Sequence, residues 1–92
     1  MTTIRLQGRL VCRDEREAAL VRTHLPRHVA LTRAEQGCLS FTVVSTDDPL
    51  VWSVDEIFED AAAFRRHLDR VRDSEWGRAT ATIARDYSID GL

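Results

Sequence analysis

The sequence contains no lysine and no asparagine, so its 13 basic residues are all arginine. With 15 acidic residues the formal net charge is -2. That balance gives no electrostatic reason to expect nucleic acid or an anionic membrane surface as a partner. We attribute the two missing residue types to coding bias in a GC-rich genome. Long apolar runs are also lacking, and none approaches the roughly 20 residues that a membrane-spanning helix needs.

Cysteine is scarce, since Cys12 and Cys38 are the only two and form no C-x-x-C pair. Isolated thiols of this kind are typical of a reducing compartment, and we see no signal peptide, so we expect a cytoplasmic protein without a disulfide. His24 and His28 have the i, i+4 spacing of a helical metal site. No ligand-rich segment accompanies them, so we expect no metal site.

Only 92 residues are present, 43% of them apolar, and we treat residues 1–92 as a single domain. Residues 3–12 alternate apolar and polar side chains and predict a strand. A helix is expected from a cap at Asp14 to about Glu35, with Pro26 kinking or splitting it near Leu25. Alternation over residues 38–46 predicts a second strand with Leu39, Phe41 and Val43 on one face.

The stretch from residue 51 to residue 68 organises the rest of the chain. Its first half alternates as a strand and places Trp52, Val54, Glu56 and Phe58 on one face, so a carboxyl group lies among apolar neighbours. The turn T-D-D-P before it is short enough to predict an antiparallel hairpin with the preceding strand.

A helix follows this strand, with Asp60 as its N-cap. Phe64, Leu68 and Val71 recur at i, i+4 and i+7 and are expected to form its buried stripe, with His67 at the border. Further on, Asp73 or Ser74 caps a short helical run, and residues 85–90 predict a last strand. If the helix capped by Asp60 packs on the sheet face that carries Glu56, the carboxyl group of Glu56 and the imidazole of His67 share one apolar space.

The predicted order is strand, helix, strand, strand, helix, strand. That order is the split βαβ, ferredoxin-like arrangement of the α+β class, a four-stranded antiparallel sheet with helices on one face. The other face is left bare, and we expect it to expose apolar surface of the kind that marks an interface. We therefore predict a symmetric homodimer.

Three stretches together resemble the antibiotic biosynthesis monooxygenase domain family, within the dimeric α/β-barrel superfamily. They are T-R-A-E-Q-G-C-L-S-F at 32–41, D-D-P at 47–49 and V-D-E-I-F-E-D-A-A-A-F-R-R-H-L at 54–68. Glu35, Gly37 and Cys38 match the family's E-P-G-C turn, with Gln36 in place of proline. The residues that match its second signature are Glu56, Phe58, Asp60, Ala63, Phe64 and His67. The resemblance covers nearly the whole chain.

The resemblance implies a homodimer in which two sheets pack into a barrel, each subunit holding a pocket between sheet and helices. Several members oxidise polycyclic phenols or quinols with molecular oxygen and without metal, flavin or haem. It therefore implies a cofactor-independent monooxygenase that acts on a small aromatic phenol or quinol. The haem-degrading branch fits poorly, because its site uses an asparagine and this sequence has none.

Chemistry of this kind needs a base that removes a proton from an electron-rich substrate in a site that excludes water. Burial raises the pKa of a carboxyl group, so Glu56 is the candidate base and His67 its candidate partner. The candidate substrate-binding residues are Trp52, Phe41, Phe58, Phe64 and His28.

Two alternatives stay open. Glu56 and His67 can instead form a structural pair that fixes how the helix packs on the strand, and the domain can be a non-catalytic module for binding or dimerisation. An open apolar cavity lined by Glu56 and His67 favours the enzyme, and a filled interior favours the module.

Overall fold

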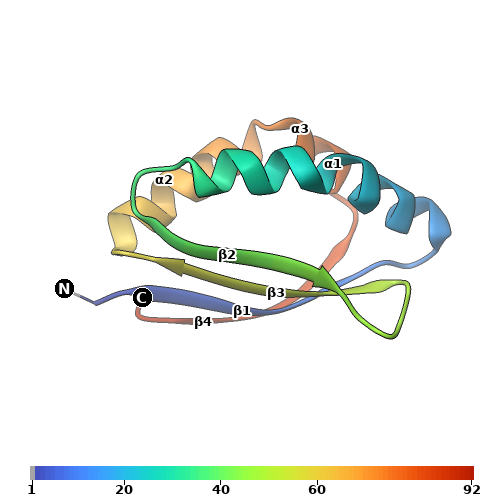
Figure 1. The fold of residues 1–92 in the computed structure, drawn as a ribbon, viewed down its shortest axis with the longest axis horizontal. Helices are drawn as coiled ribbons and strands as arrows, with labels where there is room; N and C mark the ends of the chain where they lie inside the picture. The colour runs from blue at the N-terminus through green and yellow to red at the C-terminus, as the bar shows by residue number, and fades with distance from the viewer. Residues whose placement is uncertain (1) are drawn as a thin grey trace.

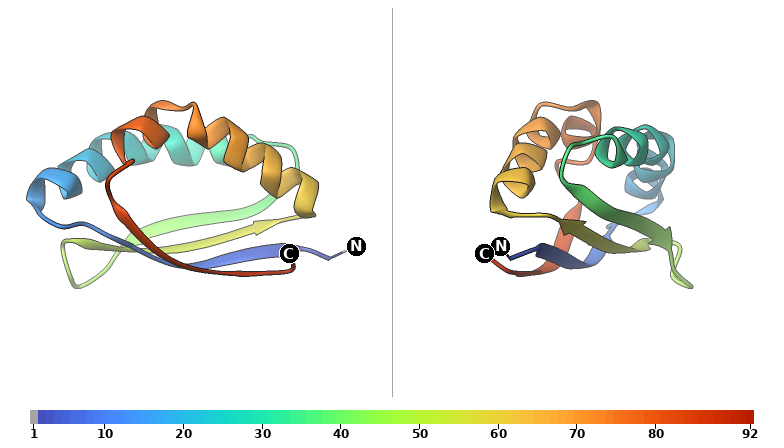
Figure 2. Two further views of the ribbon diagram at one scale, coloured as in Figure 1. Left: turned by 180° about the vertical axis from the view of Figure 1, so that it is seen from behind. Right: turned by 60° about the vertical axis from the view of Figure 1, so that its left-hand side comes forward.

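A four-stranded antiparallel sheet, with every helix on one of its faces, forms the fold of residues 2–92, which the computed structural model describes (Figure 1). The strands lie in the order β2-β3-β1-β4. The elements in chain order are β1 (Ile4–Val11), α1 (Glu15–Arg33), β2 (Cys38–Ser45), β3 (Val51–Phe58), α2 (Ala61–Arg72), α3 (Glu75–Ala79) and β4 (Ala84–Asp90). Figure 2 shows the two layers from behind and from the side. The predicted ferredoxin-like α+β fold is confirmed.

Each helix begins where a polar side chain accepts a hydrogen bond from a free backbone N–H of the first turn. Asp14 accepts from the amide of Glu17 at 3.0 Å and Asp60 from that of Ala63 at 2.8 Å. Ser74, rather than Asp73, caps α3. Local N-cap residues therefore determine where each helix starts.

Helix α1 runs unbroken through Pro26, so of the two predicted effects near Leu25, a kink or a split, the split is wrong. Proline removes one backbone donor and crowds the preceding turn, at a cost of about 3 kcal/mol in a helix interior. Val21 before the proline and Thr32 after it are both fully buried against the rest of the protein. Packing on both sides of Pro26 thus holds together a helix that local propensity disfavours.

The strand register decides which side chains meet over the sheet. Leu6 pairs with Glu56 on one side and with Ile89 on the other, and Gly8 pairs with Val54 and Tyr87 in the next row. These residues face the helices because side chains alternate along each strand. Between the layers lies the apolar core, which includes Ile4, Leu6, Leu10, Val21, Val54, Phe58 and Phe64.

Two predicted side-chain positions are wrong. The ladder between β2 and β3 shifts between Cys38 and Ser40, and this irregularity leaves Leu39 58% exposed instead of on the face of Phe41. On α2, Leu68 is 47% exposed while His67 is only 4% exposed. The helix is therefore rotated so that the imidazole, rather than Leu68, continues the buried stripe from Phe64.

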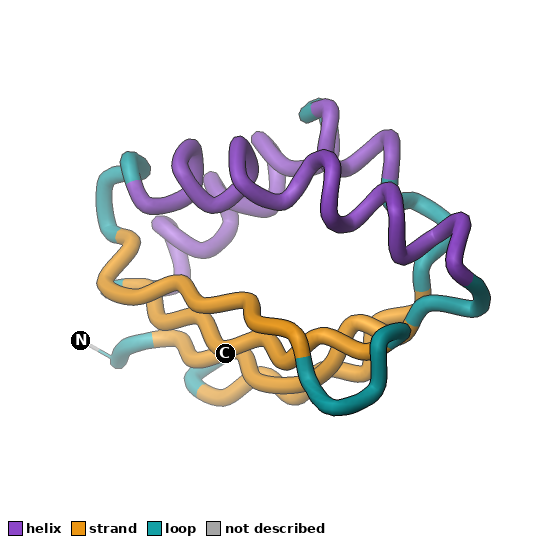
Figure 3. Tube along the Cα trace, turned by 45° about the vertical axis from the view of Figure 1, so that its right-hand side comes forward, coloured by secondary structure: helices purple, strands orange, loops and turns teal. Residues whose placement is uncertain are grey.

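The outer face of the sheet is covered by no helix among residues 2–92, as Figure 3 shows. It is more polar than we expected, because Arg5 and Asp55 form an ion pair across it at 2.9 Å and Arg9 reaches Asp86 at 3.4 Å. Exposed apolar side chains on this face include Val44. Across residues 2–92, every helix is too short or too polar to span a bilayer.

Candidate active site

Strand β3 carries Glu56 into the space between sheet and helices, where 6% of the residue stays exposed. Its alternation with Val54 and Phe58 makes this orientation unavoidable once the apolar side chains are buried. Burial raises the pKa of Glu56 to about 7, and the nearby charges of Glu35 and Asp55 push it in the same direction. Near neutral pH the carboxyl group is thus divided between its acid and its base form.

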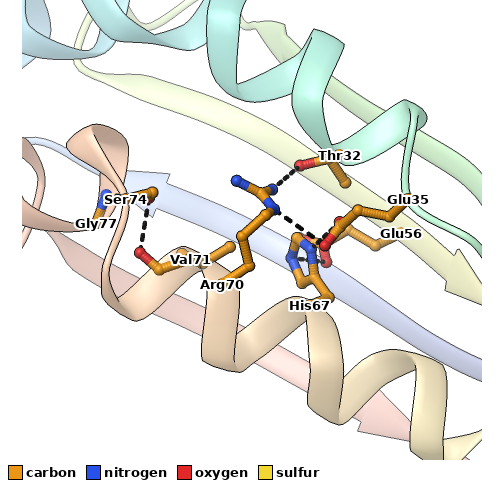
Figure 4. Close-up of polar contacts among 8 residues, drawn as sticks. All are labelled: Thr32, Glu35, Glu56, His67, Arg70, Val71, Ser74 and Gly77. Atoms are coloured by element: carbon orange, nitrogen blue, oxygen red, sulfur yellow. Dashed lines mark hydrogen bonds and ion pairs between the residues drawn. The ribbon is translucent and has the colours of Figure 1, made fainter.

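Helix α2 brings His67 over Glu56, and the predicted pairing is present (Figure 4). Nε2 of His67 lies 3.6 Å from Oε1 of Glu56, while Nδ1 lies 2.7 Å from Oε1 of Glu35. An ionised carboxylate can only accept a hydrogen bond, so the ring hydrogen is placed on Nδ1 and the Nε2 lone pair faces Glu56. Burial lowers the pKa of His67, against the opposing pull of Glu35.

Glu35 anchors this arrangement, although we did not predict a site role for it. Its Oε2 accepts a hydrogen bond from Nε of Arg70 at 3.0 Å, and Arg70 also donates to Thr32 Oγ1 at 2.9 Å. The end of α1 is thereby joined to α2 through charged groups that are partly buried. The E-Q-G-C turn marks Glu35 in the sequence, but no local signal connects it to a histidine 32 positions away.

A cavity of about 290 Å³ opens beside these groups, and we call it the inner cavity. Its polar lining consists of Glu56, His67, His28, Arg85 and Tyr87, and its apolar lining includes Phe41, Phe64, Trp76, Leu68 and Ile89. Leu68 on α2 and Ile89 on β4 are both nearly half exposed, so the mouth lies between these two elements.

Five residues were predicted to bind substrate, and the structure separates them into two groups. Phe41, Phe64 and His28 line the inner cavity. Trp52 and Phe58 lie in the core outside its lining, with the ring of Phe58 centred 4.8 Å from that of His67. Phe58 therefore packs against the imidazole of His67 and does not line the inner cavity. Trp76, Arg85 and Tyr87 were missed, because only the tertiary fold brings α3 and β4 to the cavity.

His28 stacks on Trp76, with ring centroids 4.6 Å apart and planes 5° from parallel. Burial lowers the pKa of His28 to about 3, and the positive charges of Arg70 and Arg85 together with the proximity of His67 add to the effect, so the ring stays neutral. His28 and Trp76 also line a second hollow of about 510 Å³ between α1 and α3, the outer cavity. The stacked pair is all that the two linings share.

We expected no metal site at His24 and His28, and the surroundings of His24 are as follows. Nδ1 of His24 lies 3.4 Å from Oε1 of Glu75 on α3. No cluster of three or more histidine, cysteine or acidic side chains suitable for a metal ion occurs within residues 2–92.

Comparison with known proteins gives a match over most of the chain. Residues 3–77 match the family described as antibiotic biosynthesis monooxygenase. No curated protein matches the sequence. Among solved structures, SnoaB from Streptomyces nogalater, a cofactor-independent oxygenase, superposes with a TM-score of 0.80 at 15% identity, over 100% of this chain and 94% of that one. PA3566 from Pseudomonas aeruginosa gives a TM-score of 0.71 at 26% identity, over 100% and 93% of the two chains. At 15% identity, the likeness to SnoaB shows the fold alone.

Proposed function

The chain belongs to the antibiotic biosynthesis monooxygenase family, and on that basis we propose that it oxidises a small aromatic phenol or quinol with molecular oxygen, using no metal, flavin or haem. One observation carries the proposal: Glu56 is buried, its pKa is raised to about 7, and it borders a cavity with aromatic walls. A base with a pKa close to the working pH is best suited to proton removal.

Deprotonation prepares the substrate for oxygen. Glu56 accepts the proton of a phenolic hydroxyl, and the resulting anion is electron-rich enough to give one electron to molecular oxygen. The radical pair combines into a peroxide at a ring carbon, and loss of water leaves a carbonyl there. In balance, a phenol and one oxygen molecule give a quinone and one water, and the substrate supplies all four electrons.

His67 takes the role of a partner to Glu56. Its Nε2 faces the carboxyl group at 3.6 Å and its Nδ1 is held by Glu35 at 2.7 Å, so the ring cannot turn away. The neutral imidazole can receive the proton from Glu56 or accept a hydrogen bond from the substrate hydroxyl. Phe41 and Phe64 supply flat apolar walls and keep bulk water from the anion.

The size of the inner cavity limits the substrate. A dry cavity of about 150 Å³ accepts benzene, and drug-sized ligands occupy roughly 300 Å³ or more. At about 290 Å³ the inner cavity suits one or two fused rings. An open cavity of this kind also favours an enzyme over a module with a filled interior.

The test is an oxygen-uptake screen against hydroquinones and naphthols, with three-ring anthrone-type phenols included to test the size limit. We expect Glu56→Gln to lower the catalysed rate by about 10² to 10⁴-fold, the usual contribution of a general base, and His67→Ala to lower it as well. Glu15→Gln, which changes an exposed carboxylate on α1, is the matched control and should leave the rate unchanged. Uptake that neither site substitution affects would rule out the assigned roles.

A further inference from the structure

Strand β4 contributes two polar side chains to the inner cavity that the proton-transfer chemistry leaves unused. Arg85 and Tyr87 lie two residues apart and so point to the same side of the sheet, toward the helices. Glu56 stands two strands away on β3, with β1 between them. Adjacent strands are about 4.8 Å apart, so the two sets of polar groups bound the cavity from opposite sides.

The ring of Tyr87 is placed by the absence of a side chain at Gly8. A Cβ on Gly8 would lie 2.9 Å from Cδ1 of Tyr87 and 2.8 Å from its Cα. The tyrosine therefore covers β1 at the point where the strand has no side chain, instead of turning out to solvent. Burial raises the pKa of Tyr87 to about 12, so its hydroxyl keeps its hydrogen and remains a donor at neutral pH.

Arg85 is held in place by neutral oxygens alone. Nη1 donates to the carbonyl oxygens of Thr80 and Ile83 at 2.6 and 3.0 Å, and Nη2 donates to Thr80 Oγ1 at 2.8 Å. No carboxylate among residues 2–92 pairs with this guanidinium. A fixed positive charge with spare donors at a cavity wall is suited to an oxygen that carries negative charge.

We propose that Arg85 and Tyr87 bind a second oxygen of the substrate, so that the preferred substrate is a one- or two-ring aromatic with oxygen functions at two separated positions. This inference rests on the proposed oxygenase function, because Arg85 and Tyr87 would hold the same substrate that Glu56 deprotonates. One oxygen lies at Glu56 and His67 and loses its proton. The other is held by Tyr87 and Arg85, which also draw negative charge from the deprotonated ring.

The test measures binding separately from turnover. Calorimetric titrations under argon, where no oxygenation can occur, compare 1,5-dihydroxynaphthalene with 1-naphthol, which lacks the second oxygen. We expect the wild-type protein to bind the dihydroxy compound about tenfold more tightly, the effect of one added hydrogen bond in a partly buried site. The preference ratio is the readout, because a loss of folded protein would affect both ligands equally.

Tyr87→Phe and Arg85→Gln should each reduce this preference to about threefold or less. Ser88→Ala, on the same strand but facing the outer side of the sheet, is the matched control and should keep the full preference. Equal binding of the two ligands by wild type, or an unchanged preference in both variants, would overturn the inference. Glu56→Gln should keep the preference yet lose oxygen uptake. A preference that depends on Tyr87, without any uptake by wild type, would sink the proposed function alone.

Discussion

At the scale of single residues, the protonation of Glu56 is set by its surroundings and should be visible in the rate. Because the base form is the active one and the pKa is raised to about 7, kcat/KM should rise about tenfold per pH unit below that value and level off above it. Oxygen uptake at subsaturating substrate across this range measures the profile. The residual activity of Glu56→Gln should not show this rise of kcat/KM with pH. A rise that persists in the variant would belong to another titrating group.

The same carboxyl group links folding to pH. Its pKa rises from 4.5 in the unfolded chain to about 7 in the folded protein, so between these values the folded state binds the extra proton. Its contribution to stability is therefore full below about pH 4.5, is lost as the pH rises to 7, and changes no further above that. At about 1.4 kcal/mol per pKa unit, the rise from 4.5 to about 7 corresponds to a loss of about 3 to 4 kcal/mol.

Chemical denaturation at several pH values measures this loss as a difference. The free energy of unfolding of wild type minus that of Glu56→Gln should fall between about pH 4.5 and pH 7, because the glutamine cannot titrate. Other titrating groups are common to both proteins and largely cancel. A difference that is flat or rises with pH would show that Glu56 is not buried in solution.

At the scale of elements, the joint between α1 and α2 rests on Glu35 and Arg70. Their ion pair is 3.0 Å long, with side chains 16% and 28% exposed. A double-mutant cycle with Glu35→Gln and Arg70→Gln should therefore give a coupling of about 1 to 2 kcal/mol. The exposed pair of Asp69 and Arg72 on α2 is the control, and its coupling should stay below about 0.5 kcal/mol. Equal couplings in the two cycles would contradict a structural role for the joint.

Much of the fold could be predicted from the sequence because local rules coincide with the packing. Strict alternation aims Glu56 at the helices, and the caps at Asp14 and Asp60 fix where helices begin. Prediction failed where tertiary contacts outweigh local preference. Leu68 is the more apolar residue, yet His67 is buried, because Glu35 holds its Nδ1 at 2.7 Å and Phe58 packs against its ring.

The rest of the site depends on residues that only the folded chain brings together. Glu35 meets His67 across two elements, and Trp76 meets His28 through stacking of α3 on α1. Arg85 and Tyr87 lie on an edge strand whose pattern reads as ordinary surface. No periodicity or short motif connects such positions, so the contribution of Arg85 and Tyr87 to the inner cavity could not be predicted from the sequence.

At the scale of the whole molecule, the uncovered sheet face is where we expect a second copy. The outer face of the sheet combines the ion pair of Arg5 and Asp55 with an exposed Val44. In the predicted homodimer, this face packs against the same face of the second copy. Light scattering after size exclusion should then give twice the chain mass of 10.5 kDa. Val44→Arg should shift the protein toward monomer, whereas Asp69→Ala on α2 should not. A monomeric wild type at high concentration would refute the dimer.

His28 and Trp76 form a partition two rings thick between hollows of about 290 and 510 Å³. Because this stacked pair is all that the two linings share, it sets how large a molecule the inner cavity can accept on that side. We expect small side chains at both positions to join the two hollows through the helical layer. The range of substrate sizes should therefore depend on the wall formed by His28 and Trp76, which can be redesigned while Glu56 and His67 are kept.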